Sequence, residues 1–237
     1  MSEALRRTAP RLEIKRLEAA ASFRDRAYSA LKEAITAMDI YDHPEEVRLD
    51  ERRLSLELGI SRTPIREAMT LLEQEGFVRT LPRRGIFVVK KTKRELVEMI
   101  TVWAALESMA ARLVTLHATD AEIAGLRRLM KAFESGNEGH IEEYSDANIA
   151  FHQAIIRMSG CALLSELTEN LFIHMRAIRK ITIHQDNRAA RSITDHMRII
   201  EALEARDTEM AESLVRKHTL DLAAHVERHG DFLEANQ

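Results

Sequence analysis

The chain has 237 residues, 45% of them hydrophobic, and a formal net charge of −3. That length suffices for one large domain or two ordinary ones, each with a hydrophobic core of its own. The charge is uneven, because residues 1–92 carry a net charge of +3 and residues 93–237 carry −6. The single cysteine, Cys161, excludes a disulfide framework within the chain and indicates a reducing cytoplasm. No hydrophobic run predicts a membrane span, and no secretory signal is found.

The N-terminal part of the chain alternates predicted helices with strand-like segments. Residues 1–20 are charged and alanine-rich, and we expect a flexible arm there. A cap at Ser22 and apolar residues at helical spacing predict a first helix that runs to about Asp39. A helix over 50–58, a turn at 59–60 and a second helix over 61–75 then follow. After them come a strand at 77–78, a basic turn over 82–85 and a strand over 86–89.

The C-terminal part contains no strand-like segment. From residue 83 onward the sequence has no proline and little glycine, and it is rich in Ala, Leu, Glu and Arg. That composition is typical of stacked helices. Short polar breaks divide it into six predicted helices, over residues 93–117, 119–135, 138–158, 161–184, 190–206 and 207–229. The sequence therefore predicts a mainly α protein whose second half is an all-helical, antiparallel bundle.

The second helix of the predicted N-terminal pair is suited to DNA. Its first turns carry Arg62 and Arg66, which share one face because they are four residues apart. Two helices joined by a tight turn, followed by two strands with a basic turn, describe a winged helix-turn-helix. One arginine can then fork onto a guanine edge in the major groove while the other reaches a phosphate. Further candidate contacts are Arg52 in the preceding helix, Ser61, Thr63, and Arg83 and Arg84 in the wing.

The stretches GISRTPIREAMTLLEQEGFV and PRRGIFV closely resemble the GntR family of bacterial regulators over residues 49–90. The family hallmark is R-T-P-(V/I)-R-E-A, then L-x-x-L-E-x-x-G-(L/F)-V and a wing of the form RRG. The resemblance implies that Arg52, Arg62 and Arg66 occupy DNA-contact positions, with Gly85 and its neighbouring arginines at the wing tip. The second half resembles the FCD effector-binding domain of the FadR-like branch. We predict a winged helix-turn-helix over 21–91 and a helical effector-binding and dimerisation domain over 92–237.

Nine of the ten histidines lie after residue 93. His196 and His218 lie 11 residues before and 11 residues after the break at Asp207, so an antiparallel hairpin brings them level. Asn148 and His152 are four residues apart and point the same way from one helix. Three helices can thus bring these side chains to one cavity, where imidazoles and an amide oxygen form a transition-metal site. Ordinary structural roles for these histidines remain the alternative that the residues alone leave open.

The family resemblance favours the metal. FCD domains commonly carry D-x-x-x-H on one helix, then one histidine on each of two later helices about 22 residues apart. This chain matches the pattern with His152, His196 and His218, but Asn148 replaces the usual aspartate. Since Asn148 brings no charge, we expect a weak fourth ligand and a larger contribution from an effector carboxylate. We predict Zn²⁺ or Ni²⁺, because imidazole ligands favour such ions over Mg²⁺ or Ca²⁺.

Four further residues are candidates for contact with the effector. His174 is displaced along its helix by about 9 Å from the level of His152, which makes it a ligand-contact residue rather than a metal ligand. Trp103 stands where many FCD domains have an arginine, and either lines the effector pocket or packs in the core. Arg176 and Arg179 can supply the lost positive charge, although a solvated helix face is the expected place of one of them.

The leading interpretation is a cytoplasmic, ligand-responsive transcriptional repressor without enzymatic activity. It would bind double-stranded DNA at a palindromic operator as a homodimer, with a small carboxylate effector and no membrane partner. One alternative is a metal-dependent hydrolase-like domain fused to a DNA-binding module, but no carboxylate beside the histidines is predicted to act as a general base. The other alternative, an effector-free DNA-binding dimer, does not explain histidines that converge inward.

Overall fold

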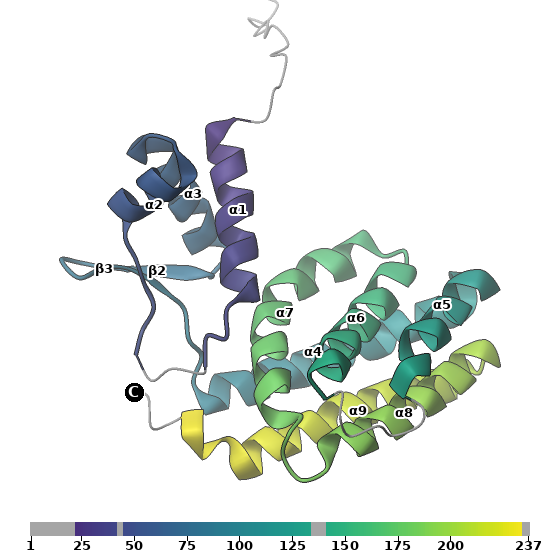
Figure 1. Cartoon of the computed structure of the whole chain (residues 1–237). Helices are drawn as coiled ribbons and strands as arrows, with labels where there is room; N and C mark the ends of the chain where they lie inside the picture. The colour runs from purple at the N-terminus through teal and green to yellow at the C-terminus, as the bar shows by residue number, and fades with distance from the viewer. Residues whose placement is uncertain (1–21, 42–44, 134–140, 234–237) are drawn as a thin grey trace, which may run out of the picture.

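The computed structural model describes residues 22–41, 45–133 and 141–233, with the side chains of residues 141, 142 and 232 excepted. The predicted arm over residues 1–20 lies outside these residues. Figure 1 shows a small N-terminal part with three helices and a sheet, beside a larger part made of long helices. The predicted class is confirmed: the protein is mainly α, with a winged helix-turn-helix followed by an all-helical domain.

The N-terminal part follows the predicted order of elements, with one addition. Ser22 caps the first helix through a capping box with Asp25, and Asp50 caps the second through the backbone N–H groups of Arg52 and Arg53. The addition is β1, a two-residue strand that pairs with β3 and was not predicted. The elements are α1 (Phe23–Ala37), β1 (Arg48–Leu49), α2 (Glu51–Leu58), α3 (Arg62–Gln74), β2 (Val78–Leu81) and β3 (Gly85–Val88).

The sheet is antiparallel in the order β1-β3-β2. The register of the hairpin pairs Val78 with Val88 and Leu81 with Gly85, so the turn that joins the strands holds Pro82, Arg83 and Arg84. Val78 and Val88 are both buried, so this end of the hairpin is anchored on the N-terminal core. The opposite end, with the basic turn, projects away from the helices as a wing (Figure 1).

All six predicted long helices of the second half are present, within a few residues of the predicted ends. Two short 3-10 turns extend α5 and α9. The elements are α4 (Lys93–His117), α5 (Asp120–Met130), η1 (Lys131–Phe133), α6 (Ile141–Met158), α7 (Ala162–Thr182), α8 (Arg188–Glu204), α9 (Thr208–His229) and η3 (Gly230–Leu233).

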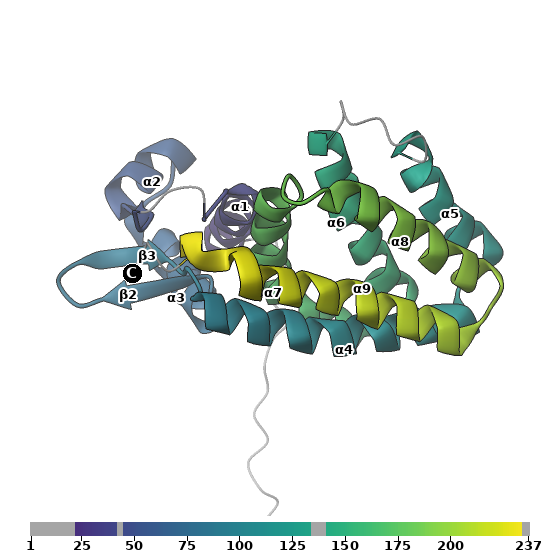
Figure 2. The ribbon, with the colours of Figure 1, turned by 90° about the horizontal axis from the view of Figure 1, so that it is seen from below.

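The helical domain is built around α4 and α9, which lie side by side along most of their length (Figure 2). Buried residues of α4, among them Leu96, Ile100 and Val114, form the centre of the core. Of the helices that the structure describes, α4 is the one long and apolar enough to cross a membrane, and half of its most apolar window is buried in the protein. A buried core helix meets the same criteria, so α4 is weak evidence for a membrane.

Helix α7 joins the two parts of the molecule, because it packs on the helical domain and also contacts α1 (Figure 1). Asn170 donates to the backbone carbonyl of Glu75 at 2.8 Å, at the end of α3. His174 Nδ1 lies 2.8 Å from the hydroxyl of Tyr41, which follows α1. These contacts connect the DNA-reading part to the helix that also borders the histidine cluster described below.

Candidate DNA interface and metal centre

Helix α3 has one apolar face and one charged face. Its apolar face packs on α1 and is formed by four buried side chains, Ile65, Ala68, Met69 and Leu72. Arg62, Thr63 and Arg66 are exposed at the other face, where the side chains of the two arginines are 44% and 59% accessible. Ser61 occupies the N-cap position of the helix, as predicted. The helix therefore presents its predicted DNA-reading residues to solvent.

A carboxylate on α2 holds the two arginines of α3. Glu51 Oε2 accepts a hydrogen bond from Arg62 Nη2 and another from Arg66 Nε, each at 2.8 Å. The bond from Arg62 is the main cause that lowers the pKa of the Glu51 carboxyl, so the group is ionised at neutral pH. One carboxylate oxygen thus fixes the positions of both guanidinium groups.

Positive charge also gathers in a recess between α2, α3 and the sheet. Three arginines, Arg48, Arg52 and Arg62, line it together with Gly85 and with the carboxylates of Asp50 and Glu51, and its volume is about 380 Å³. Gly85 has a φ of 116°, which disfavours any other residue, and an added Cβ would lie 2.9 Å from Arg48 Nε. Arg48 was missed from the sequence because its strand was not predicted.

The wing tip carries the two predicted arginines. Arg83 has a φ of 64° in the tight turn between β2 and β3. The side chain of Arg84 is 68% exposed, and its guanidinium carbon lies 5.7 Å from the centre of the Phe87 ring. Both residues stand at the end of the hairpin farthest from its buried end, as the sequence predicted for the wing tip.

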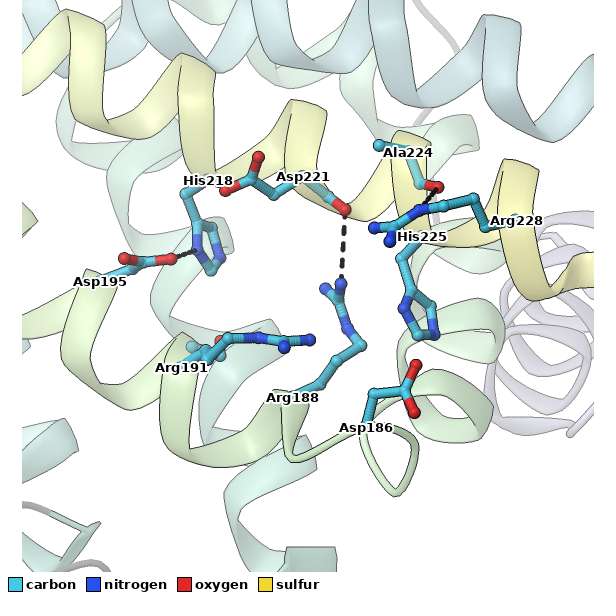
Figure 3. Close-up of a pocket in the computed structure, with 10 residues that line it drawn as sticks. Asp186, Arg188, Arg191, Asp195, His218, Asp221, Ala224, His225 and Arg228 are labelled. Atoms are coloured by element: carbon cyan, nitrogen blue, oxygen red, sulfur yellow. Dashed lines mark hydrogen bonds and ion pairs between the residues drawn. The ribbon is translucent and has the colours of Figure 1, made fainter.

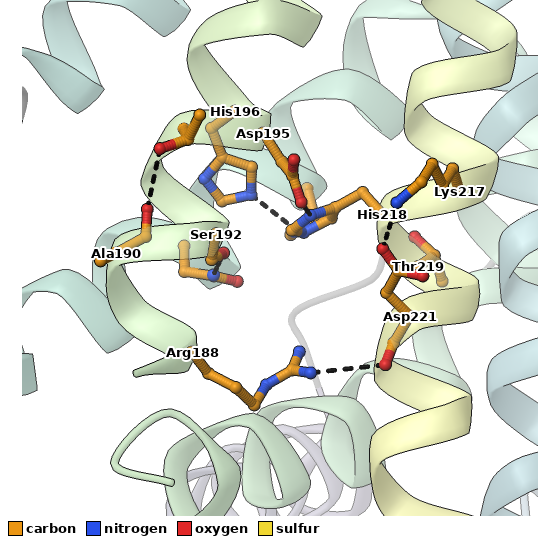
Figure 4. Close-up of polar contacts among 12 residues, drawn as sticks. Arg188, Ala190, Ser192, Asp195, His196, Lys217, His218, Thr219 and Asp221 are labelled. Carbon is orange, nitrogen blue, oxygen red and sulfur yellow. Dashed lines mark hydrogen bonds and ion pairs between the residues drawn. The ribbon is translucent and has the colours of Figure 1, made fainter. Parts of the chain in front are cut away.

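In the helical domain, three buried histidines meet from three helices: His152 on α6, His196 on α8 and His218 on α9. Their ring centroids are 4.7 to 5.3 Å apart. His152 Nε2 and His196 Nε2 are separated by 3.3 Å, and one ligand atom of each residue lies within 4.8 Å of the others. The structure thus brings together the three histidines that the spacing in the sequence predicted, and Figure 4 shows two of them, His196 and His218.

The outer nitrogen of each ring has its own partner, which orients the ring. The three pairs are His152 Nδ1 with Glu107 Oε1, His196 Nδ1 with the Tyr144 hydroxyl at 3.2 Å, and His218 Nδ1 with Asp195 Oδ2 at 3.2 Å. The sequence interpretation had placed no carboxylate beside the cluster, whereas the structure places two. Both lie at the outer nitrogens, where they orient the rings.

Glu107 is completely buried and serves as an acceptor. Trp103 Nε1 and Thr219 Oγ1 each donate to its Oε2 at 2.8 Å. Burial raises the pKa of the Glu107 carboxyl, while the charge of Arg179 and these two donors act in the opposite direction. Glu107 Oε1 also shares a hydrogen bond with His152 Nδ1, and this contact fixes the orientation of the ring.

The donor set fits a divalent transition metal. The hydrogen bond to His218 is the main cause that lowers the pKa of the Asp195 carboxyl, so this carboxylate accepts from Nδ1 of the ring and leaves the lone pair on Nε2. Since one nitrogen of each of the three rings lies within 4.8 Å of the others, a single cation can contact all three. Burial holds the pKa values of His152 and His196 well below their ordinary value, and a neutral imidazole is the form that binds metal.

Asn148 lies one helical turn before His152 and is buried with it. Its Oδ1 accepts a hydrogen bond from Arg179 Nη1, and its Nδ2 donates to Ser192 Oγ at 3.0 Å. Arg179 is itself buried and acts electrostatically on all three histidines. A guanidinium therefore occupies the neighbourhood of the oxygen that was predicted as a fourth ligand.

A cavity of about 360 Å³ opens beside the histidine cluster, between α8 and α9 (Figure 3). Its chemistry is strongly charged, and His218 and Asp195 form the wall shared with the cluster. The residues that line it are Asp186, Arg188, Arg191, Ser192, Asp195, His218, Asp221, Ala224, His225 and Arg228. Sequence reasoning missed its three arginines, since they stand among many charged residues and no motif distinguishes them.

Arg188 is the most notable of these arginines. Its Nη1 lies 3.4 Å from the backbone carbonyl of Asp221, a long contact, and its buried Nε finds no hydrogen-bond partner within the described residues. Burial lowers the pKa of Arg188 to about 10, which leaves the guanidinium charged at neutral pH. A buried donor without a partner is costly, so an anionic ligand in the cavity would satisfy a group that the protein leaves open.

The four residues predicted to contact an effector lie elsewhere. Trp103 is buried in the core, where its ring packs edge-on against Phe172 at a centroid distance of 4.3 Å. His174 lies at the junction with the N-terminal part. Arg176 is partly exposed and 3.6 Å from an aspartate of α6, whereas Arg179 borders the histidine cluster. None of the four is among the described residues that line the cavity beside α8 and α9.

Comparison with known families agrees with both halves of this geometry. A family model described as bacterial regulatory proteins of the gntR family matches residues 23–88, which contain the recognition helix and the wing. The model of the FCD domain matches residues 98–221, which contain the three histidines. The chain belongs to the GntR family. It is a transcriptional regulator of the type that joins a GntR helix-turn-helix to an FCD domain.

Curated relatives of this GntR-family chain are regulators as well. It is 30% identical over 175 residues to the uncharacterized HTH-type transcriptional regulator YdhC of Bacillus subtilis, covering 72% of this chain and 77% of that protein. It is 29% identical over 170 residues to a probable D-xylose utilization operon transcriptional repressor of Paenarthrobacter nicotinovorans, covering 71% and 74%. Similarity therefore extends through both domains in each case.

Solved structures show the same fold. McbR/YncC of E. coli superposes with a TM-score of 0.71 and 24% identity, covering 89% of this chain and all of that one. A transcriptional regulator of the same family from Rhodococcus superposes with a TM-score of 0.68 and 22% identity, covering 87% and 98%. The relative arrangement of the two domains thus recurs in this fold.

Proposed function

We propose that this GntR-family regulator is a homodimeric repressor of a palindromic operator, controlled by a small carboxylate at a metal-containing site. The observation that carries the proposal is the pairing of two features in one chain. An exposed arginine pair stands on a recognition helix, and a buried cluster of three imidazoles stands beside a cavity lined by three arginines and three aspartates. The first feature supports operator binding, and the second supports a metal and an anion.

The DNA-binding role assigns base contacts to Arg62 and Arg66, and backbone contacts to Arg52, Ser61, Thr63 and the wing residues 83–85. A bidentate contact between arginine and guanine is worth about 1–3 kcal/mol, and a dimer makes each contact twice. The test measures the affinity of Arg62→Ala and Arg66→Ala for the operator by fluorescence anisotropy in a salt titration. Arg94→Ala is the matched control, since Arg94 is an exposed arginine of α4 in the other domain. Wild-type affinity in both test variants would contradict the role.

The sensing role places a divalent ion between His152, His196 and His218, with Asn148 as a weak fourth ligand. Such an ion is a Lewis acid that can bind an effector carboxylate. The residues of the protein do the rest: Glu107 and Asp195 orient two rings, and the cavity arginines attract the anion. We propose Zn²⁺ or Ni²⁺, the ions that imidazole ligands favour.

The metal test compares elemental analysis of untagged wild type, His196→Ala and His117→Ala. The control residue, His117, is an exposed histidine at the end of α4. We expect one ion to disappear from each chain in His196→Ala and none in His117→Ala, while both keep operator affinity. Equal metal content in wild type and His196→Ala would contradict the site. Arg188→Met then tests the anion, because it should weaken the response to carboxylates without removing the ion.

The dimer is supported by an apolar stripe on α4. Val102, Met109 and Leu116 follow at intervals of seven residues, about two helical turns, and their exposed fractions are 54%, 45% and 56%. Exposed apolar side chains on one helix face are typical of an interface. Sedimentation should show a dimer for wild type and a monomer for Met109→Glu. Leu163→Glu, at a leucine of α7 that is 60% exposed, is the control and should stay dimeric.

We also propose that the protein acts in the cytoplasm and that its helical domain senses rather than catalyses. The need to reach DNA and a single cysteine support the first statement. The second is supported by relatives that are named as transcriptional regulators. Hydrolysis of a candidate carboxylate ester by the metal-loaded protein would contradict it.

A further inference from the structure

A second group of potential metal ligands lies at the rim of the same cavity. It consists of Asp186, in the loop between α7 and α8, and of His225 and His229 on the last turns of α9. The proposed regulation uses none of these three residues. Figure 3 shows the carboxylate of Asp186 facing the ring of His225 across the rim.

The geometry of this group is that of a cation site. His225 and His229 are four residues apart, so their rings leave the helix on one side, with centroids 4.7 Å apart. His229 Nε2 lies 3.2 Å from Asp186 Oδ2. One possible ligand atom of each of the three residues lies within 4.8 Å of the other two. A single ion can therefore contact all three without a change of the backbone.

The chemistry of the group points to a transition metal. Two imidazoles and one carboxylate are a common donor set for Zn²⁺, Co²⁺ and Fe²⁺. Gln185 Oε1 accepts a hydrogen bond from His225 Nε2 at 2.7 Å, which leaves the lone pair of that ring on Nδ1. His225 is buried, whereas the side chains of Asp186 and His229 are 56% and 42% exposed. An ion can thus arrive from solvent and keep water molecules in its remaining positions.

We propose that Asp186, His225 and His229 form a second divalent transition-metal site, distinct from the three-histidine centre. His225 lies seven residues after His218 on α9, so the two sites are separated by about 10 Å along the helix axis. An ion at the rim ties the loop between α7 and α8 to α9, across the entrance of the cavity.

The surroundings set the order in which the two sites fill. Arg188 acts electrostatically on His225, and Arg228 lines the same cavity. Two cations next to a dication weaken its binding more than the single guanidinium of Arg179 does at the centre, where carboxylates also lie at the outer nitrogens of His152 and His218. The rim site therefore binds the second equivalent of metal, and it binds more weakly than the centre.

The test uses full-length, untagged protein stripped with a chelator and titrated with Zn²⁺, with the bound ions counted by native mass spectrometry. Two ions are expected per wild-type chain. His229→Ala and Asp186→Asn, both at exposed side chains that a folded protein tolerates, should each bind one. His196→Ala should also bind one, and the double variant of His196 and His229 none. His117→Ala should bind two.

The count keeps this site apart from the proposed function. If wild type binds only one ion and His196→Ala binds none, the rim site is overturned and the proposal of a central metal stands. Two ions in His229→Ala and Asp186→Asn would overturn it as well. One ion in His196→Ala that the double variant of His196 and His229 lacks would support the rim site whatever the effector proves to be. Titration with Co²⁺ adds a check. The visible spectrum of bound Co²⁺ should lose one set of bands in His196→Ala and a different set in His229→Ala.

Discussion

The junction between the two domains should make the protein sensitive to mild acid. His174 on α7 is 4% exposed, and its Nδ1 shares a hydrogen bond with the hydroxyl of Tyr41. Burial, together with the charge of Lys91, lowers the pKa of His174 to about 4, and the charge of Glu95 acts against both. The folded protein therefore holds this imidazole neutral well below the pH at which an exposed histidine takes up a proton.

The sign and size of the effect follow from linkage. The folded-state pKa of His174 lies below its unfolded value, so its contribution to stability is complete above a pH of about 6.5. As the pH falls below that value, His174 takes up a proton in the unfolded chain but not in the folded chain. The free energy of unfolding therefore decreases until the pH passes the folded-state pKa. The loss amounts to about 2 kcal/mol at a pH of about 5 and to about 3 kcal/mol in total.

The assay compares wild type with His174→Asn, whose amide can keep a hydrogen bond to Tyr41 but does not titrate. Urea unfolding of both proteins in the same chelator gives the free energy of unfolding near a pH of about 7.5 and about 5. The other histidines titrate equally in both proteins, so they cancel in the difference. The stability advantage of wild type over the variant should shrink by about 2 kcal/mol at the lower pH. A difference that stays constant with pH would refute the reasoning.

Three further changes have defined outcomes. Glu51→Gln frees the two recognition arginines and should raise affinity for DNA of any sequence about threefold to tenfold at low salt, since exposed ion pairs are worth about 0.2–1 kcal/mol each; anisotropy showing unchanged affinity would contradict this. Trp103→Phe removes a donor from buried Glu107 and should lower the free energy of unfolding by about 1–3 kcal/mol in urea denaturation; equal stability would show that the bond contributes nothing. Asn148→Asp adds a charge beside the metal and should tighten Zn²⁺ binding about tenfold in competition with a chelating dye; weaker binding would mean that Arg179 retains the new carboxylate.

Much of the fold was predictable because its signals are local. Caps such as Ser22 and Asp50, and the apolar spacing of α3, depend on neighbouring residues alone. The meeting of His196 and His218 was predictable from equal distances to the break at Asp207, because two antiparallel helices have the same rise per residue. The two-residue strand β1 was not predictable, since two residues cannot display an alternating pattern.

The surroundings of the site depended on contacts between distant segments. Glu107 meets Thr219 across 112 residues of chain because α4 and α9 pack side by side, and no spacing rule reaches that far. The cavity arginines depend on a loop where Asp186 and Asn187 adopt positive φ values of 48° and 55° without the glycine that would have signalled it. The hydrogen-bond partner of His174, Tyr41, lies in the other domain, so helix spacing around His174 could not predict it.

Helix α7 has a thermodynamic consequence for the regulator as a whole. The same helix touches Asn148 through Arg179 and the DNA-reading part through Asn170 and His174. Coupling between two binding sites is reciprocal, so the factor by which an effector changes operator affinity equals the factor by which the operator changes effector affinity. A protein bound to its operator and one free in solution should therefore respond at different effector concentrations. Weakening an α7 contact should reduce the coupling, so that the bound and the free protein respond at more similar effector concentrations.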